Sequence, residues 1–140
     1  MCGIVAYIGP REAYPIILKG LKRLEYRGYD SSGVALLNKD LRVYKRKGKV
    51  AELEDSLVGR DLHAHAGMGH TRWATHGEPS VVNSHPHSDA TNSVFVVHNG
   101  IIENYVDLRA GLEQVGIEFR SQTDTEVLPN LINRAYDANG

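Results

Sequence analysis

The chain has 140 residues, with 16 basic and 17 acidic side chains and a formal net charge of -1 at pH 7. Its 41% hydrophobic and 24% charged residues are typical of a globular domain that buries a core, which excludes disordered and fibrous classes. The near-neutral charge argues against a general nucleic-acid binder, because the densest basic cluster, Lys45–Lys49, is short and acidic residues follow it. We therefore expect no nucleic-acid partner.

The sequence also gives no indication of a membrane partner. Its strongest apolar runs, Ile4–Ile8 and Val94–Val97, are far shorter than the roughly 18 residues that cross a bilayer. The start of the chain lacks a basic segment, and Gly9-Pro10 interrupts the first apolar run, so no secretory signal is recognised. The expected location is cytoplasmic. Cys2 is the only cysteine, which excludes an internal disulfide and a multi-cysteine zinc site.

Hydrophobic periodicity predicts strands and helices, without strict alternation, in the first part of the chain. The helix assignments rest on apolar residues that recur at three- and four-residue spacing. Turn residues separate the two central strands. The expected elements are a buried strand at Ile4–Ile8, a helix that begins at Arg11 and stops at Arg27-Gly28, strands at Val34–Leu37 and Leu41–Tyr44, and a helix over Val50–Leu57.

The second part of the chain begins with a histidine-rich segment, His63–Asp89, that has little helical period and is predicted to form a strand and functional loops. Pro129 suits a last helix only if it lies in the first turn. The order of elements favours an α+β fold with mixed sheets layered against helices. The remaining predicted elements are a buried strand at Val94–Val97, a helix capped by Asn104 and ended by Gly116, a strand at Ile117–Phe119, and a helix after Thr123–Thr125.

Cys2 is the first residue that could carry chemistry. If Met1 is trimmed, Cys2 bears both a thiol and a free α-amine. An α-amine titrates near pH 8, so part of it is unprotonated at neutral pH and can accept the thiol proton directly or through a water. The alternative is a thiol that only packs at the start of a strand.

The histidines suggest a rival chemistry. His63 and His65, and likewise His85 and His87, have the i, i+2 spacing that places two imidazoles on one face of a strand, as in half of a zinc site. The carboxylates considered for completing such a site are Asp61, Asp89 and Glu78. Exposed or hydrogen-bonded histidine is the interpretation that we favour, and no metal is expected.

Three further segments have a composition that suits a binding site. Thr71–Pro79 combines the Arg72 guanidinium, which can grip a carboxylate, with an aromatic ring and hydroxyls before a Gly/Pro-rich loop. Asn99-Gly100 offers an amide and an unhindered N–H to an oxyanion, but a type I′ turn is a frequent use of this pair and is the interpretation favoured for the pair alone. Gly67–Gly69 lacks the rest of a phosphate loop and is interpreted as a turn or a close-packing site.

Six motifs in order resemble one known family, the glutaminase domain of the glucosamine-6-phosphate synthases, which are class II glutamine amidotransferases. This resemblance implies an N-terminal nucleophile (Ntn) hydrolase fold, an α+β αββα sandwich of antiparallel sheets that is incomplete at the C-terminus. It also implies that residues 1–140 are the N-terminal part of the glutaminase domain, with the isomerase domains absent. The motifs are Met1–Val5, Glu25–Gly33, Gly69–Gly77, Asn83–His87, Val97–Asn104 and Thr123–Glu126.

The same resemblance implies hydrolysis of L-glutamine through a γ-glutamyl thioester on Cys2, without a cofactor. In the full-length family members, sugar isomerase domains use the ammonia to convert fructose 6-phosphate to glucosamine 6-phosphate. Alternatives are the glutaminase domain of another amidotransferase, such as glutamine phosphoribosylpyrophosphate amidotransferase, and a catalytically inactive fragment. The implied site comprises Asn99 and Gly100 as the oxyanion hole, Arg72 for the substrate carboxylate, Asp124 for its ammonium, Trp73, Thr75, His76 and Gly77 in the pocket, and Arg27 and His85 in support.

Overall fold

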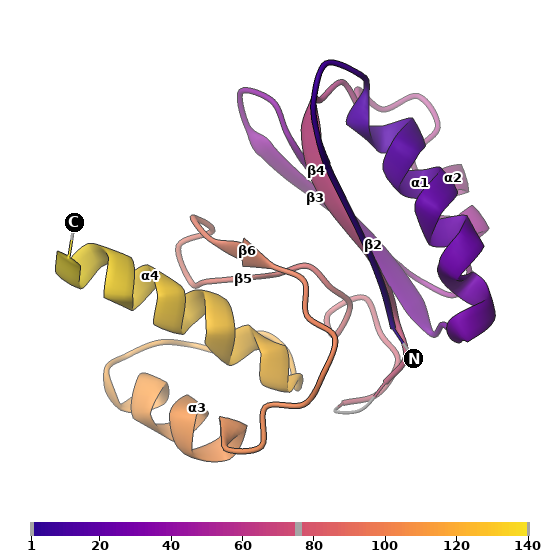
Figure 1. Cartoon of the computed structure of the whole chain (residues 1–140). Coiled ribbons are helices and arrows are strands. Elements are labelled where there is room, and N and C mark those ends of the chain that lie inside the picture. The colour runs from indigo at the N-terminus through magenta and orange to yellow at the C-terminus, as the bar shows by residue number, and fades with distance from the viewer. Residues whose placement is uncertain (1, 75–76, 140) are drawn as a thin grey trace.

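A computed structural model describes residues 2–74 and 77–139. Two antiparallel sheets lie between two pairs of helices (Figure 1). The strands of the first sheet, in their order across it, are β1 (Gly3–Ile8), β4 (Ala66–Arg72), β2 (Ser31–Leu37) and β3 (Leu41–Lys47). The second sheet pairs β5 (His87–Ser88) with β6 (Phe95–Val96). The helices are α1 (Ala13–Leu24), α2 (Val50–Ser56), α3 (Tyr105–Gln114) and α4 (Val127–Asn139), with short 3-10 helices at Glu25–Arg27 and Asp124–Glu126.

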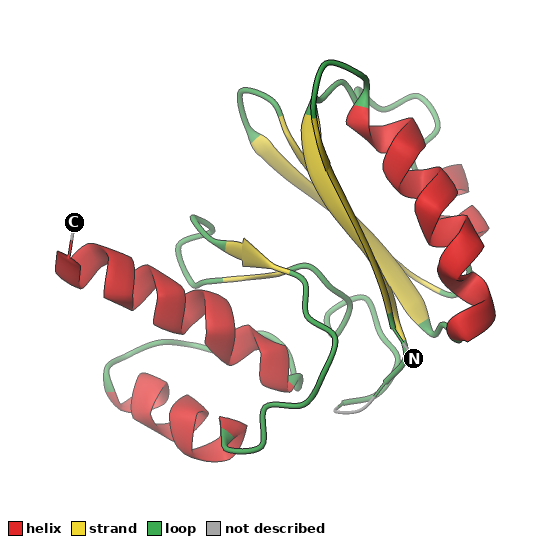
Figure 2. Ribbon diagram, viewed as in Figure 1, coloured by secondary structure: helices red, strands yellow, loops and turns green. Residues whose placement is uncertain are grey.

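The layers follow the order helix, sheet, sheet, helix. Helices α1 and α2 cover one face of the four-stranded sheet, and the short β5–β6 pair lies on its other side, followed by α4 and α3 (Figure 2). The architecture therefore confirms the α+β fold and the antiparallel sheets that the resemblance implies. The mixed sheets expected from the order of elements are wrong, because every pair of described strands is antiparallel. None of the described helices is both long enough and apolar enough to cross a membrane.

The main core lies between α1, α2 and the four-stranded sheet. The apolar stripe of α1 supplies Ile17 and Leu21, which are fully buried. A Cβ on Gly69 of β4 would lie 2.5 Å from Ile17 Cγ2 and 2.8 Å from Leu21 Cδ1, so the helix packs directly on the strand backbone. Close packing, one of the two interpretations given to Gly67–Gly69, is therefore correct for Gly69. The core residues are Ala13, Ile17, Leu18, Leu21, Val34, Leu36, Val50, Leu53, Leu57 and Ala64.

The predicted first helix, hairpin and second helix are confirmed within a few residues. The first strand is also in place, but its description as buried is wrong. β1 is an edge strand with an alternating burial pattern, and Ile8 is 85% exposed. Neighbouring apolar residues of such a strand point to opposite faces, so a continuous apolar run does not show that both faces are covered.

Two strand predictions in the second part of the chain need correction. Val94–Val97 is only half-buried, and its paired part is limited to the two residues of β6. Ile117–Phe119 forms no strand. The Ile117 N–H bonds back to the Leu112 carbonyl at the end of α3, and the Phe119 ring lies under the Arg109 guanidinium, 4.6 Å from its carbon. The backbone of Ile117 and the ring of Phe119 are therefore bound to α3, and the segment pairs with no described strand.

The last two helices begin where the sequence indicates. Asn104 precedes α3, but its side chain makes no capping hydrogen bond, and only its carbonyl accepts, from the Leu108 N–H. Pro129 is the third residue of α4. At that position its missing N–H falls among the donors that have no partner within a helix, which explains why the proline is tolerated.

Candidate active site

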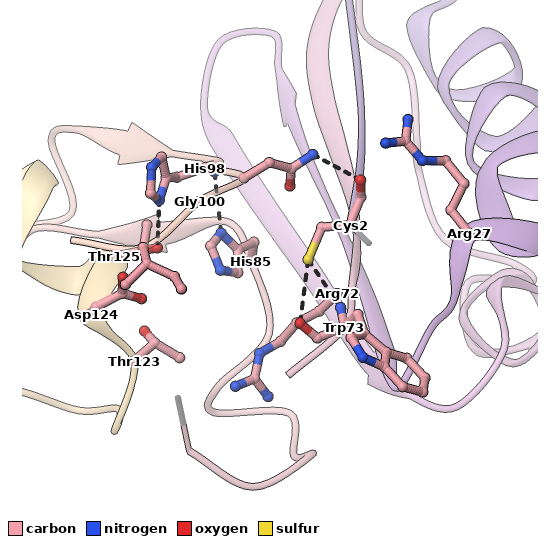
Figure 3. A pocket seen from close by; sticks show the side chains of 12 residues that line it. Cys2, Arg27, Arg72, Trp73, His85, His98, Gly100, Thr123, Asp124 and Thr125 are labelled. Atoms are coloured by element: carbon pink, nitrogen blue, oxygen red, sulfur yellow. Dashed lines mark hydrogen bonds between the residues drawn. The ribbon is translucent and has the colours of Figure 1, made fainter. Parts of the chain in front are cut away.

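Cys2 lies at the start of β1, beside the end of β4. Pairing of Gly3 with Thr71 brings the thiol against Trp73, whose N–H donates to Cys2 Sγ at 3.0 Å. The thiol in turn points to the Trp73 carbonyl at 3.4 Å (Figure 3). Thr71 Oγ1 accepts the Gly3 N–H at 3.1 Å. The side chain remains partly exposed. The sheet register thus fixes a reachable sulfur at the rim of a cavity.

Asn99 faces Cys2 from the segment that follows β6. Its Nδ2 donates to the Cys2 carbonyl at 2.9 Å, so the amide donor is already aimed at the start of the chain. Gly100 has φ of +147°, a conformation that side chains disfavour. Among the described residues Asn92 is the only non-glycine with positive φ, whereas a type I′ turn needs positive φ at Asn99 as well. The type I′ turn alternative for Asn99-Gly100 is therefore wrong.

His70 sets the orientation of that amide, and the sequence-based site did not include it. His70 Nε2 lies 2.8 Å from Asn99 Oδ1 and 3.2 Å from the His98 carbonyl, two atoms that only accept. Burial lowers the pKa of His70 to about 4, so the ring is neutral at pH 7. Nδ1 has no hydrogen-bond partner among the described residues. The proton therefore belongs on Nε2, and its donation directs the NH₂ of Asn99 toward Cys2.

Arg72 and Trp73 continue from the end of β4 into the loop below Cys2. Arg72 is buried, and its guanidinium donates to the carbonyls of Gly77 and Glu78, each at 3.1 Å. Asp30 lies 3.7 Å from the same guanidinium and also accepts the Ala74 N–H. These contacts fix the loop on both sides of Thr75 and His76, which themselves lie outside the described residues.

Asp124 approaches the cavity from the opposite wall, in the 3-10 helix before α4. It is buried, and its Oδ2 accepts the Ile102 N–H at 2.7 Å, which links it to the segment after Gly100. Glu126, in the same 3-10 helix, accepts the N–H groups of Arg120 and Ser121. The Ile102 N–H therefore holds the Asp124 carboxylate itself, and the contacts of Glu126 hold the 3-10 helix that carries it.

These side chains enclose one cavity of about 390 Å³, within the range of roughly 300 to 1,000 Å³ usual for small-molecule sites. Figure 3 shows the thiol and the Asp124 carboxylate on opposite walls. Gly77 contacts Arg72 but does not line the cavity. His98, Ile101, Thr123 and Thr125 line it without having been predicted. The lining residues are Cys2, Arg27, Arg72, Trp73, His85, His98, Asn99, Gly100, Ile101, Thr123, Asp124 and Thr125.

His85 and His87 are packed and hydrogen-bonded, as the favoured interpretation held. The His85 ring stacks on His70 with 4.0 Å between centroids and accepts the His98 N–H at its Nδ1, while His87 Nε2 meets Thr123 Oγ1 at 2.9 Å. Asp89, one of the carboxylates that could complete a metal site, instead accepts the N–H groups of Thr91, Ser93 and Val94. This pair therefore supports the wall of the cavity.

The buried histidines make stability fall in mild acid. Burial lowers the pKa of His70 to about 4 and that of His87 to about 3, and burial next to His70 also lowers the pKa of His85. Below pH 6.5 these histidines are protonated in the unfolded chain but remain neutral in the folded chain. The free energy of unfolding should therefore decrease from pH 6.5 downward, by on the order of 3 kcal/mol for His70 alone at pH 4. Urea unfolding at pH 7.5, 6.0 and 5.0 measures this, and equal stabilities would contradict it.

The family model of the glutamine amidotransferase domain matches residues 57–138. This chain belongs to the glutamine amidotransferase family. The amidotransferase domain is 60% identical over 134 residues to the glutamine–fructose-6-phosphate aminotransferase (isomerizing) of Bacteroides thetaiotaomicron. The aligned region spans 94% of this chain and 22% of that relative. The Aquifex aeolicus relative of the same name is 56% identical over 97% of the chain and 23% of its own length.

Two solved structures share the fold of this amidotransferase domain. One is described as the allosteric regulatory enzyme of purine biosynthesis, with a TM-score of 0.81 and 28% identity over 96% of the chain and 30% of that structure. The other is the glutamine phosphoribosylpyrophosphate amidotransferase from B. subtilis, with a TM-score of 0.79 and 30% identity over 96% and 29%. They confirm the N-terminal nucleophile hydrolase fold. The chain spans less than a quarter of the length of the curated relatives, at 22% and 23%.

Proposed function

We propose that this domain hydrolyses L-glutamine to glutamate and ammonia through a thioester on Cys2. The observation that carries the proposal is the cavity in which the Cys2 thiol, the Asn99 amide and Gly100 converge. Such a set supplies a nucleophile and donors for an oxyanion. Membership of the glutamine amidotransferase family supports glutamine as the substrate.

In the proposed reaction the α-amine of Cys2 accepts the thiol proton, and sulfur attacks the side-chain carbonyl carbon of glutamine. Asn99 Nδ2 and the Gly100 N–H stabilise the negative oxygen of the tetrahedral intermediate. The C–N bond breaks, and the ammonium form of the α-amine protonates the leaving ammonia. Water then attacks the thioester, releases glutamate and returns the proton to sulfur. Each oxyanion donor contributes about 3 kcal/mol in enzymes where one has been removed.

The cavity walls suit the two ends of a glutamine molecule. We assign the substrate α-carboxylate to Arg72 and the α-ammonium to Asp124, the buried cation and anion that line the cavity. Arg27 and His85 line the same cavity and are assigned supporting roles. The remaining proposed pocket residues are Trp73, which lines the cavity, and Thr75, His76 and Gly77 in the segment that follows it. Gly77 does not line the cavity itself and would act through its carbonyl, which accepts from Arg72.

The proposed fate of the ammonia follows the relatives. We infer that residues 1–140 are the N-terminal part of a glutaminase domain that works with sugar isomerase domains to aminate fructose 6-phosphate. The relatives named glutamine–fructose-6-phosphate aminotransferase, at 56% and 60% identity, support this more than the phosphoribosylpyrophosphate amidotransferase structure at 30%.

The direct test is to incubate the Met-free chain with L-glutamine and to measure glutamate and ammonia. Equal amounts of the two products should accumulate, and D-glutamine should give none, because the α-carboxylate and α-ammonium would exchange places. Absence of turnover by folded, Met-free chains would contradict the proposal for this chain and support the inactive-fragment alternative.

His70→Leu is expected to lower kcat by up to about 100-fold with little change in KM, because Asn99 loses the donor that orients it while the substrate-binding side chains stay in place. His70→Gln, which keeps an N–H donor at similar reach, should recover part of the loss. In an Asn99→Ala background the His70→Leu change should have almost no further effect. Additive losses in kcat would show that His70 does not act through Asn99.

A further inference from the structure

A second cluster of chemistry-bearing side chains lies at the opposite end of the four-stranded sheet from Cys2. β1 and β4 are antiparallel, so Gly3 pairs with Thr71 near the thiol, whereas Ile8 pairs with Ala66 at the far end. Glu12, just before α1, meets His63 and His65, just before β4, at this far end. The cluster is therefore independent of the proposed glutaminase site.

The backbone holds the two segments of this cluster together. The Gly9 N–H donates to the His65 carbonyl at 3.0 Å, and the Ala13 N–H donates to the Ala64 carbonyl at 2.8 Å. The Ala64 N–H in turn reaches Glu12 Oε2 at 3.3 Å. Two segments far apart in sequence are thus held in a fixed register, since Glu12 and Ala64 are separated by 52 positions.

The three side chains converge in a way that suits a metal ion. One ring nitrogen of each histidine and one Glu12 oxygen all lie within 4.8 Å of one another, and all three residues are exposed. His63 Nδ1 already contacts Glu12 Oε1 at 2.5 Å, and the two imidazoles meet edge to face with 5.1 Å between centroids. Among the described residues this is the only group of histidine, cysteine or acidic side chains with such convergence.

A hydrogen bond between the His65 ring and the backbone is the second observation that points to a ligand. His65 Nδ1 lies 2.9 Å from the Arg11 carbonyl, which only accepts, so the proton is on Nδ1 and the Nε2 lone pair is available. Metal-binding histidines in proteins are usually held in this way, through the ring N–H that does not face the metal. The Asp61 carboxylate, which accepts the His63 N–H, adds negative charge nearby.

We propose that Glu12, His63 and His65 form a surface site for a first-row divalent transition metal such as zinc. Two imidazoles and one carboxylate give three protein ligands with a position left for water, a set that zinc accepts. Calcium and magnesium prefer all-oxygen sites and are not expected to bind here. The i, i+2 histidine spacing considered in the sequence thus has a role at His63 and His65, with a carboxylate that is remote in sequence. A bound ion would tie the start of α1 to the segment before β4.

Zinc binding tests this proposal. Isothermal titration with zinc chloride, in a Cys2→Ala background that removes the thiol, should show one ion per chain, and the melting temperature should rise with zinc but not with magnesium. His65→Ala and Glu12→Gln should each weaken zinc binding at least about tenfold. Loss of a residue that only hydrogen-bonds to a metal ligand already lowers affinity by about that factor, and these two residues are proposed to bind the ion directly. Asp61→Asn, which keeps the acceptor for the His63 N–H, is the matched control and should retain binding.

Two results would overturn the site. One is the absence of stoichiometric zinc binding to the folded chain. The other is equal zinc affinity in the His65→Ala, Glu12→Gln and Asp61→Asn chains, which would place the ion elsewhere. Because Cys2 is absent from every variant in this comparison, the outcome is separate from that of the glutaminase proposal.

Discussion

Cys2→Ala is expected to abolish glutamine hydrolysis, with kcat falling by on the order of 10⁶-fold, as when a covalent nucleophile is removed from other hydrolases. Among the described residues that line the cavity, Cys2 is the only one with a thiol. It is also hydrogen-bonded both to the Asn99 amide, through its carbonyl, and to the Trp73 N–H, through its sulfur. Stability should change little, because Cys2 is only partly buried and is absent from the main core. Steady-state release of glutamate and a thermal melt measure the two effects.

His65→Ala is the matched control for that experiment, since it lies at the far end of the sheet and outside the cavity. It should retain glutaminase activity. If Cys2→Ala chains kept wild-type turnover while remaining folded, the nucleophile assignment would be wrong. If glutamine hydrolysis depended on added zinc and was lost in His65→Ala, the chemistry would belong to the metal cluster instead.

A chain that retains a residue ahead of Cys2 is expected to lose roughly 10²- to 10⁴-fold in kcat, the usual contribution of general acid–base catalysis. An amide bond at Cys2 removes the amine that titrates near pH 8, while the thiol itself stays in place. Intact mass separates chains with and without Met1, and each form is assayed separately. Alkylation of the thiol by a small reagent checks that Cys2 is accessible in both forms, and equal kcat values would refute the role of the amine.

The sequence predicts the local elements well where the periodicity is strong. The amphipathic stripe of α1 and the hairpin of β2 and β3 need only local spacing and turn residues, and both are confirmed. Ile117–Phe119 was predicted wrongly because its composition suits a strand, whereas only tertiary contacts decide whether a partner strand exists. For the same reason the burial of Ile4–Ile8 was overestimated, since the sequence does not show that β1 is an edge strand.

The site illustrates the same limit at the level of single side chains. The motifs resembling the family lead to Cys2, Asn99 and Asp124, and the fold brings these into one cavity from three separate segments. His70 was missed because its role depends on a hydrogen bond to Asn99 that joins residues 29 apart in sequence. The position of His70 in β4, two residues before Arg72, does not indicate that Asn99 is its partner. The contact between Glu12 and His63 was missed for the same reason, because the two residues are 51 positions apart in sequence.

The most direct test of the central claim is intact mass and peptide mapping of the folded chain after exposure to an electrophilic glutamine analogue, with and without excess L-glutamine. We predict a single adduct on Cys2 of Met-free chains, formed more slowly when glutamine competes for the cavity. Folded, Met-free chains that gain no adduct on Cys2, or gain it at the same rate in excess glutamine, would contradict a working nucleophile and glutamine pocket within these residues.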